Sequence, residues 1–146
     1  MTFIKGVKSS QFDWLFSSRD NTLWQSSKTI YDPCPPGWRV PDGGDNGVWS
    51  KAVGSKEDFK YAWDSTCKGI DFTGKFGSAE TIWYPAAGFL YYADGSLDIV
   101  GSGGGWWSCT PDVYYAYLLG LDSSGDVYPS GSDGRAFGLS VRCLQE

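Results

Sequence analysis

A chain of 146 residues with a net charge of −5 and no histidine lacks the groups that several classes of function require. No lysine follows Lys75, so there is no basic stripe of the kind that neutralises nucleic-acid phosphates. Missing histidine removes the commonest general base and metal ligand, and no pair of carboxylates stands out by its spacing. We therefore expect no catalytic residue, no metal, no cofactor and no nucleic-acid partner.

Length and composition favour one domain. The 20 glycines, 7 prolines and 17% aromatic residues favour a loop-rich α+β fold over a helical bundle. No apolar run is long enough for a transmembrane helix, and the first five residues lead into no signal-type segment. We expect one domain over 1–146, with 1–30 as its lead-in. The chain is then either a fragment of a longer protein or a protein not exported by that route.

The first forty residues predict short strands and a rigid corner. Aromatic runs at 12–16 and 22–24, set among serine-rich turns, indicate one or two edge strands. Three prolines within 33–36 fix φ and remove hydrogen-bond donors, which excludes a helix or a central strand there. A short strand is predicted over 37–40, with Trp38 in the core.

Two short helices are predicted next. The first covers 45–53, with Asp or Asn as its N-cap. The second begins at Ser55, because Phe59, Ala62 and Trp63 follow the spacing of one helix face. Helices this short depend on packing against a sheet for their stability.

Strands and turns are predicted for the middle of the chain. Residues 65–81 read as a polar connection, and 82–85 and 87–91 read as strand pieces. The Asp-Gly pair at 94–95 is a strong hairpin signal. The glycine run at 102–105 is predicted to be a flexible loop apex.

The last third of the chain alternates aromatic and small residues, which indicates strands, with a hairpin turn over 124–129. One face of an alternating strand must point inward. We expect Ala116 and Leu118 to be buried, and Tyr115 and Tyr117 to be exposed.

Two long motifs carry a resemblance to a known family. They are Asp-Pro-Cys-Pro-Pro-Gly-Trp-Arg-Val-Pro at 32–41, read with Trp107-Ser108, and Arg-Ala-Phe-Gly-Leu-Ser-Val-Arg-Cys at 135–143. Over about residues 30–146 the chain resembles the Fibrobacter succinogenes major paralogous domain and its relatives in Bacteroidetes and their phages. That group is similar to C-type-lectin-fold proteins, including variable proteins diversified by retroelements.

The resemblance implies a C-type-lectin-like fold with paired terminal strands, two helices and a loop-rich second sheet. It also implies that Cys34 and Cys143 lie close together as a disulfide. Cys67 and Cys109 are left either as a second pair or as free thiols, and Cys109 stands where the family more often has serine. The calcium and sugar motifs of animal C-type lectins do not occur, so calcium-dependent sugar binding is not implied. The scaffold is expected to include Trp83, Trp107, Val141 and Arg142.

A compositional trace fits retroelement diversification. Mutating the first two bases of AAC codons cannot produce Lys, Glu, Gln, Met or Trp. Residues 1–83 contain 19 of these five types, whereas the 26 residues over 109–134 contain none. Strands and turns also deplete Lys and Glu, which is the plainer explanation.

We therefore expect a binding module whose partner is a protein or glycan on a cell or virion surface. The chain itself would lie on a virion or bacterial cell surface, or be secreted, without membrane insertion. Tyrosine and tryptophan supply large, rigid contact area at low entropy cost. The residues expected to contact the ligand are Tyr91, Tyr92, Asp98, Trp106, Asp112, Tyr114, Tyr115, Tyr117, Asp122, Tyr128, Ser132 and Asp133.

Two alternatives stay open. One is an undiversified adhesive or structural domain of a surface lipoprotein. The other is an enzyme, since the formylglycine-generating enzymes have a similar fold, although no match to their reactive cysteine pair is visible in this sequence.

Overall fold

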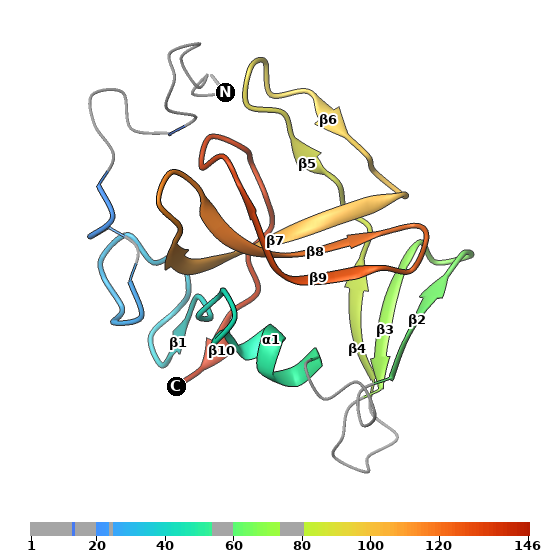
Figure 1. Cartoon of the computed structure of the whole chain (residues 1–146), viewed down its shortest axis with the longest axis horizontal. Coiled ribbons are helices and arrows are strands. Elements are labelled where there is room, and N and C mark those ends of the chain that lie inside the picture. The colour runs from blue at the N-terminus through green and yellow to red at the C-terminus, as the bar shows by residue number, and fades with distance from the viewer. Residues whose placement is uncertain (1–12, 14–19, 24, 54–59, 74–80) are drawn as a thin grey trace.

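The computed structural model of the chain describes residues 13, 20–23, 25–53, 60–73 and 81–146 (Figure 1). These residues form four small antiparallel sheets and one short helix, which agrees with the α+β class but contains less helix than predicted. The elements in chain order are β1 (Trp38–Arg39), α1 (Val48–Val53), β2 (Lys60–Asp64), β3 (Gly69–Thr73), β4 (Thr81–Pro85), β5 (Phe89–Leu90), β6 (Leu97–Asp98), β7 (Gly103–Pro111), β8 (Ala116–Asp122), β9 (Val127–Asp133) and β10 (Leu144–Gln145).

The sheet β7–β8–β9 is the middle of the fold, and both faces of its central strand β8 are buried. Leu119 and Leu121 face the main core, where they pack in one cluster with Trp106 of β7 and Tyr84 of β4. The opposite face carries a second cluster, which consists of Trp107, Ala116 and Leu118 with the partly buried Phe137, Leu139 and Val141. The predicted burial of Ala116 and Leu118 is confirmed, but the alternate residues of β8 are core as well.

The outer edge of β7 is covered by three other parts of the chain. Gly88 N–H donates to the Gly103 carbonyl at 2.9 Å, and Trp107 N–H donates to the Ser140 carbonyl at 3.0 Å. Cys109 N–H donates to the carbonyl of Pro41 at 2.9 Å. These backbone hydrogen bonds fix the segments around Pro41, Gly88 and Ser140 along the outer edge of β7.

The glycine run is part of this sheet and not a flexible loop apex. The stretch 103–105 is buried within β7 and pairs in register with 120–122 of β8. Side chains of neighbouring segments occupy the space that larger residues would need: Leu139 lies against Gly105, and Ile99 Cδ1 would lie 2.7 Å from a Cβ on Gly103. The glycines therefore allow the side chains of neighbouring segments to pack closely against the backbone of β7.

The sheet β2–β3–β4 corrects two predictions. Residues 60–64 form a strand, and the predicted connection over 65–81 contains β3. Trp63 pairs with Ile70 and packs against the main core. Strand pairing and period-two alternation therefore make this segment a strand and not a helix. The start of the predicted second helix, 55–59, lies outside the described residues.

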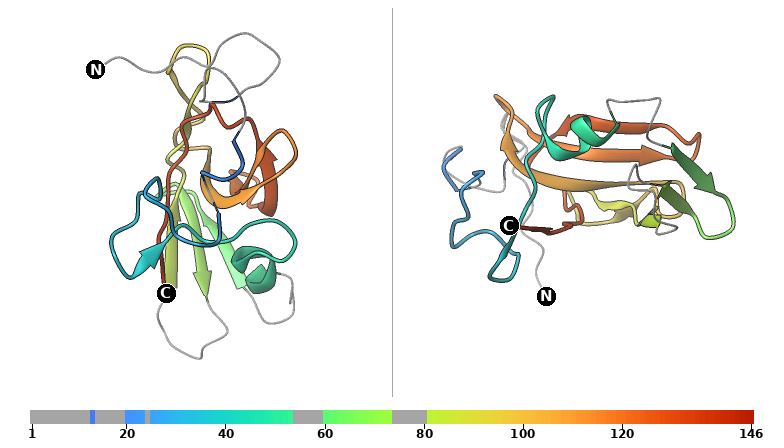
Figure 2. Two further views of the ribbon diagram at one scale, coloured as in Figure 1. Left: turned by 90° about the vertical axis from the view of Figure 1, so that its left-hand side faces the viewer. Right: turned by 90° about the horizontal axis from the view of Figure 1, so that it is seen from below.

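Helix α1 matches the later part of the first predicted helix. Val48 N–H donates to the Asp42 carbonyl at 3.1 Å at its start, and Trp49 and Val53 are buried. Trp49 Nε1 donates to the hydroxyl of Tyr84 at 3.3 Å, which connects the helix to β4. Helix α1 also lies against β9 (Figure 2). Among the described residues, no helix is long and apolar enough to cross a membrane.

Both predicted hairpins are confirmed. β5 and β6 pair around Gly95, whose φ is 75°, and β8 and β9 pair around Gly125, whose φ is 88°. Left-handed φ values favour glycine, which is why local sequence was sufficient to find these turns.

The two ends of the domain meet in one corner. β1 pairs with β10, and a disulfide joins Cys34 to Cys143, with Cα atoms 5.8 Å apart, as the resemblance implied. Trp38 is 40% exposed and not a core residue, because Val40 fills the core position of this corner and packs with the two bridged cysteines. The predicted strands at 12–16 and 22–24 lie mostly outside the described residues, and 20–23 forms a turn.

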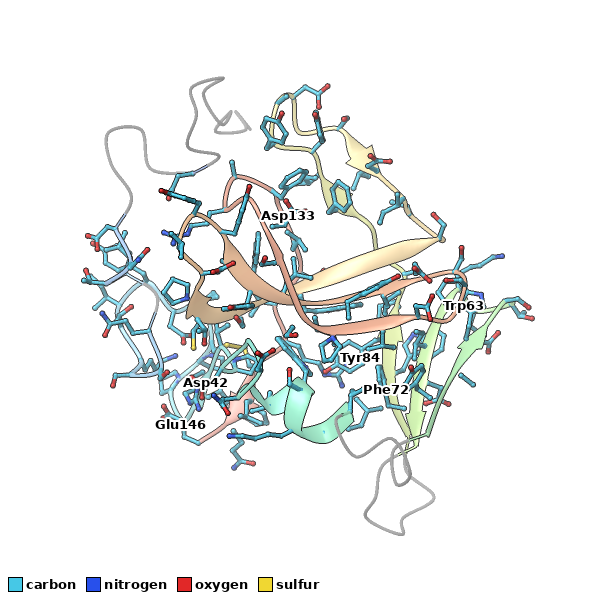
Figure 3. The ribbon with its side chains drawn as sticks, viewed as in Figure 1. Asp42, Trp63, Phe72, Tyr84, Asp133 and Glu146 are labelled. Carbon is cyan, nitrogen blue, oxygen red and sulfur yellow. A yellow bond between two sulfur atoms is a disulfide. The ribbon has the colours of Figure 1, made fainter. Side chains whose placement is uncertain are left out.

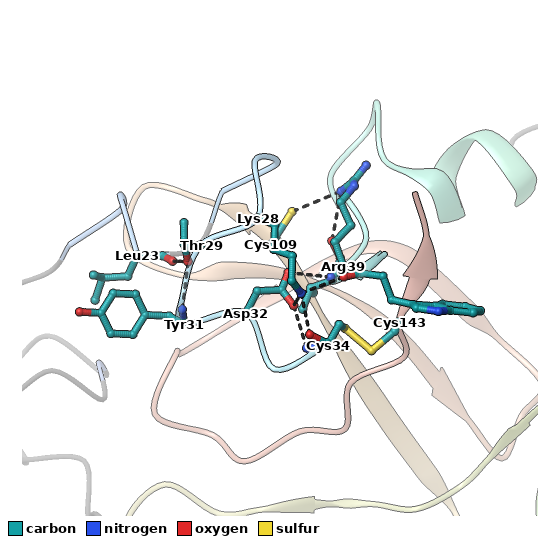
Figure 4. Close-up of polar contacts among 11 residues, drawn as sticks. Leu23, Lys28, Thr29, Tyr31, Asp32, Cys34, Arg39, Cys109 and Cys143 are labelled. Atoms are coloured by element: carbon teal, nitrogen blue, oxygen red, sulfur yellow. Dashed lines mark hydrogen bonds and ion pairs between the residues drawn. A yellow bond between two sulfur atoms is a disulfide. The ribbon is translucent and has the colours of Figure 1, made fainter. Parts of the chain in front are cut away.

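One buried carboxylate organises this corner (Figure 4). Asp32 accepts hydrogen bonds from the backbone amides of Cys34 at 2.8 Å and Val40 at 3.0 Å. The ammonium of Lys28 lies 3.2 Å from the same carboxylate and also donates to the carbonyls of Cys34 and Trp38. Burial acts to raise the pKa of Asp32, but these donors outweigh it and hold the pKa below its usual value.

Replacing Asp32 with Asn should cost about 2 kcal/mol of unfolding free energy near neutral pH, because two amides and an ammonium lose a charged acceptor. A depressed folded-state pKa stabilises the fold above the unfolded pKa, and this contribution is lost as the pH falls through the folded value. The gap between wild type and Asp32→Asn should therefore shrink below about pH 4 in urea titrations. Asp45→Asn, at an exposed turn position, is the control, and a pH-independent gap for Asp32→Asn would contradict the assignment.

Candidate binding surface

The candidate surface is built around the segment 134–138, which follows β9 and is called the ridge below. Phe137 N–H donates to the Gly134 carbonyl at 3.1 Å, which closes a turn. Gly138 and Leu90 exchange backbone hydrogen bonds of 2.8 and 2.9 Å, so the ridge lies beside β5. The ridge therefore connects the end of the central sheet to the β5–β6 hairpin (Figure 1).

An aromatic cluster occupies one side of the ridge. The ring of Phe137 has edge-type contacts with Phe89, Tyr91 and Tyr92, at centroid distances of 5.3, 5.7 and 5.1 Å. The ring centroids of Tyr91 and Tyr92 lie 4.6 Å apart. A side-chain hydrogen bond with Tyr92 is the main cause of the raised pKa of Tyr91. Both tyrosines are half-buried, so they combine a packing role with an accessible rim.

The turn between β7 and β8 lies on the other side of the ridge. Asp112 and Tyr115 exchange two backbone hydrogen bonds of 3.0 and 2.9 Å. The side chains of Val113, Tyr114 and Tyr115 are exposed at 71%, 57% and 41%. Arg135 of the ridge donates through Nε to the carbonyl of Tyr115 at 2.9 Å, so the ridge and the turn are in direct contact.

Seven of the twelve predicted ligand residues belong to this surface. Asp133 precedes the ridge and pairs with Ala116, the residue after Tyr115, and Ser132 pairs with Tyr117. Both Ser132 and Asp133 are exposed. The seven residues are Tyr91, Tyr92, Asp112, Tyr114, Tyr115, Ser132 and Asp133. They are called the ridge surface below.

Two predicted residues lie at the far end of the sheet. Asp122 and Tyr128 flank the β8–β9 turn, beside Trp63, whereas Asp133 lies at the opposite end of β9 (Figure 3). The hydroxyl of Tyr128 donates to Asp122 at 2.8 Å, so their polar groups bond each other.

The other three predicted residues occupy different positions. Trp106 is only 4% exposed, and its ring packs edge-on to that of Tyr84, so assigning it to the ligand surface was wrong. Tyr117, expected to be exposed, is half-buried because its ring lies over Gly44. Asp98 is exposed on β6, which is separated from the ridge by β5.

A cavity of about 360 Å³ lies beneath the turn. Pro111 and Ala116, which flank the turn, both line it. The remaining walls come from the lead-in, the central sheet and the ridge: Asp20, Asn21, Leu23, Tyr31, Trp107, Cys109, Thr110, Arg135 and Phe137.

Sequence reasoning missed the parts of this surface that hold it together. Arg135 and Phe137 were grouped with the C-terminal motif, and Asn21 with the lead-in. One signal was available, since Arg135 is the first basic residue after Lys75. A lone cation in a long neutral or acidic tract suggests a specific anionic or carbonyl partner.

The two remaining cysteines are free thiols. Cys109 is buried and donates to Asp42 at 3.4 Å; burial first, and then the charge of Asp42, raises its pKa to about 12. Cys67 is exposed after β2, where the charge of Asp64 raises its pKa. Raised pKa values disfavour the thiolate, the reactive form of cysteine. Within the described residues, no group of three or more potential ligand side chains could hold a metal ion.

Comparison of the chain with protein-family models, curated proteins and solved structures found no match. Function must therefore be inferred from the ridge surface and from the composition of the tract 109–134, which contains most of that surface.

Proposed function

We propose that the chain is a ligand-binding module that presents the ridge surface to a protein or glycan on a cell or virion surface. The observation that carries the proposal is the gathering of four tyrosines, two aspartates and Ser132 around one fixed segment, the ridge. Tyrosines supply stiff contact area, while Ser and Asp supply adaptable polar contacts. Recognition would then depend on shape and a few central anchors, without chemical reaction.

We further propose a C-type-lectin-like scaffold and a diversified surface. Support for the scaffold comes from the paired terminal strands and the bridged corner cysteines, both of which the resemblance implies. Support for diversification comes from the tract 109–134, which lacks five residue types and contains five of the seven residues of the ridge surface. The same tract also contains buried strand residues, so diversification would be limited to its exposed positions.

Binding is tested with the biotinylated protein, displayed as streptavidin tetramers, on arrays of bacterial surface glycans and purified surface proteins. For a confirmed hit, Tyr114→Ala or Tyr115→Ala should weaken affinity by about thirtyfold, as expected for an interface anchor. Tyr128→Ala is the matched control, because it removes a tyrosine of similar exposure (49%) at the far end of the sheet. A hit that depends on Tyr128 and not on the ridge surface would contradict the proposal.

The alternative is an undiversified adhesive domain with the same surface. The DNA sequence beside the gene distinguishes the diversified module from the undiversified domain. Diversification requires a second, imperfect copy of the gene's 3′ end, differing at adenines, beside a reverse transcriptase. Its absence would favour the adhesive domain.

A further inference from the structure

The guanidinium of Arg135 joins two distant parts of the chain. Its Nη1 lies 3.4 Å from the Asp13 carboxylate, and its Nη2 donates to Asn21 Oδ1 at 2.6 Å. The same guanidinium donates to the carbonyls of Tyr115 at 2.9 Å and Asp112 at 3.4 Å. The side chains of Arg135 and Asp13 are only 8% and 1% exposed.

The two carbonyls that Arg135 contacts are the ones that close the β7–β8 turn. Each already accepts a backbone hydrogen bond from the other residue of the Asp112–Tyr115 pair. A planar guanidinium can hold several acceptors in a fixed geometry, which an ammonium on a flexible stem cannot do. Arg135 thus fixes both ends of the turn relative to the ridge.

The cavity makes this contact more important. Because Pro111 and Ala116 line the cavity, the side chains of the described residues do not fill the space beneath the base of the turn. A four-residue turn with two backbone hydrogen bonds is marginally stable alone. Its position therefore depends strongly on the polar contacts of Arg135.

We infer that Arg135 is a positioning residue through which the lead-in sets the conformation of the ridge surface. Asp13 and Asn21 hold the guanidinium, the guanidinium holds the turn, and the turn presents Tyr114 and Tyr115. This inference rests on the proposed function. Affinity would then depend on residues of the lead-in that do not touch the ligand, because a fixed turn pays less ordering entropy on binding.

The test uses variants of the full chain and two measurements that need no natural ligand. The first is hydrogen exchange, followed by NMR, at the amides of Asp112 and Tyr115. The second is affinity for a nanobody selected on the wild-type protein and mapped to the turn by its loss of binding to Tyr114→Ala. Asn21→Ala is the principal variant, since removing Asp13 would leave a buried charge unpaired and endanger folding.

Asn21→Ala should speed exchange at both turn amides by about tenfold, the effect of losing one charge-assisted hydrogen bond. Nanobody affinity should fall by about threefold in Asn21→Ala and about tenfold in Arg135→Lys, as the competent population decreases. Asn21→Asp keeps the acceptor and should restore wild-type behaviour, and Ile30→Ala, at a 92% exposed position of the lead-in, should change nothing. The amides of Leu119 and Leu121 in β8 should exchange at wild-type rates in every variant.

Unchanged turn exchange in both Asn21→Ala and Arg135→Lys would overturn the inference. Equal acceleration in the turn and in β8 would also overturn it, because the effect would then be global destabilisation. Failure to find a natural ligand would count against the proposed function and would leave both measurements unaffected.

Discussion

Removing the Cys34–Cys143 disulfide should lower the free energy of unfolding by about 4–5 kcal/mol, the largest single effect expected in this fold. The bridge spans 109 residues of sequence and joins the entry and exit of the domain. Cross-linking so long a loop removes much of the conformational freedom of the unfolded chain. Cys34 also packs in a cluster with Val40 and Cys109, so the bridge is part of a small core.

Urea unfolding of a Cys34→Ala/Cys143→Ala double variant against wild type measures this effect. Cys67→Ala is the control, because Cys67 is exposed and free, and it should change stability by less than about 0.5 kcal/mol. Intact-mass analysis should find one disulfide and two free thiols in the wild type. A loss below about 1 kcal/mol in the double variant would contradict the role given to the bridge.

Trp106→Ala should destabilise the fold by about 3–5 kcal/mol and leave the ridge surface chemically intact. The indole is buried between the central sheet and β4, where it packs edge-on to Tyr84 at a centroid distance of 4.8 Å. Truncation would remove buried apolar area and leave a cavity that a sheet on each side prevents from collapsing.

The control for Trp106→Ala is Val113→Ala, at the most exposed position of the β7–β8 turn. It should change stability by no more than about 0.5 kcal/mol. Urea titrations followed by circular dichroism give both values. If Trp106→Ala kept wild-type stability but lost ligand binding, the indole would be a contact residue after all.

Features set by local chemistry were predictable from the sequence. Prolines at 33–36 restrict the backbone, and glycines at turn positions permit the left-handed φ that the turns require, so the corner and both hairpins were predictable. The prediction that Cys34 bonds to Cys143 came from the family resemblance of the motifs that contain them. Local patterns alone do not determine which cysteines meet.

Features set by tertiary packing were not predictable. Ala62 and Trp63 fit a helix face, but pairing with β3 makes their segment a strand, because short apolar patterns suit both structures. Trp106 and Tyr117 seemed suited to a surface, yet covered faces of the central sheet bury one and half-bury the other. The role of Arg135 was not predictable because its hydrogen-bond partners lie up to 122 residues away in the sequence.

We propose that the ridge surface is interchangeable on a fixed scaffold, and a randomised library is the direct test of this proposal. Five residues of the ridge surface and the neighbouring exposed Val113 would be randomised together, displayed on yeast and selected against hen egg-white lysozyme. The five residues are Tyr91, Tyr114, Tyr115, Ser132 and Asp133. A second library would randomise six residues of the main core. Most members of the first library should resist proteolysis and some should bind lysozyme, whereas most members of the second library should lose the fold. Loss of protease resistance in most members of the first library would contradict the proposal.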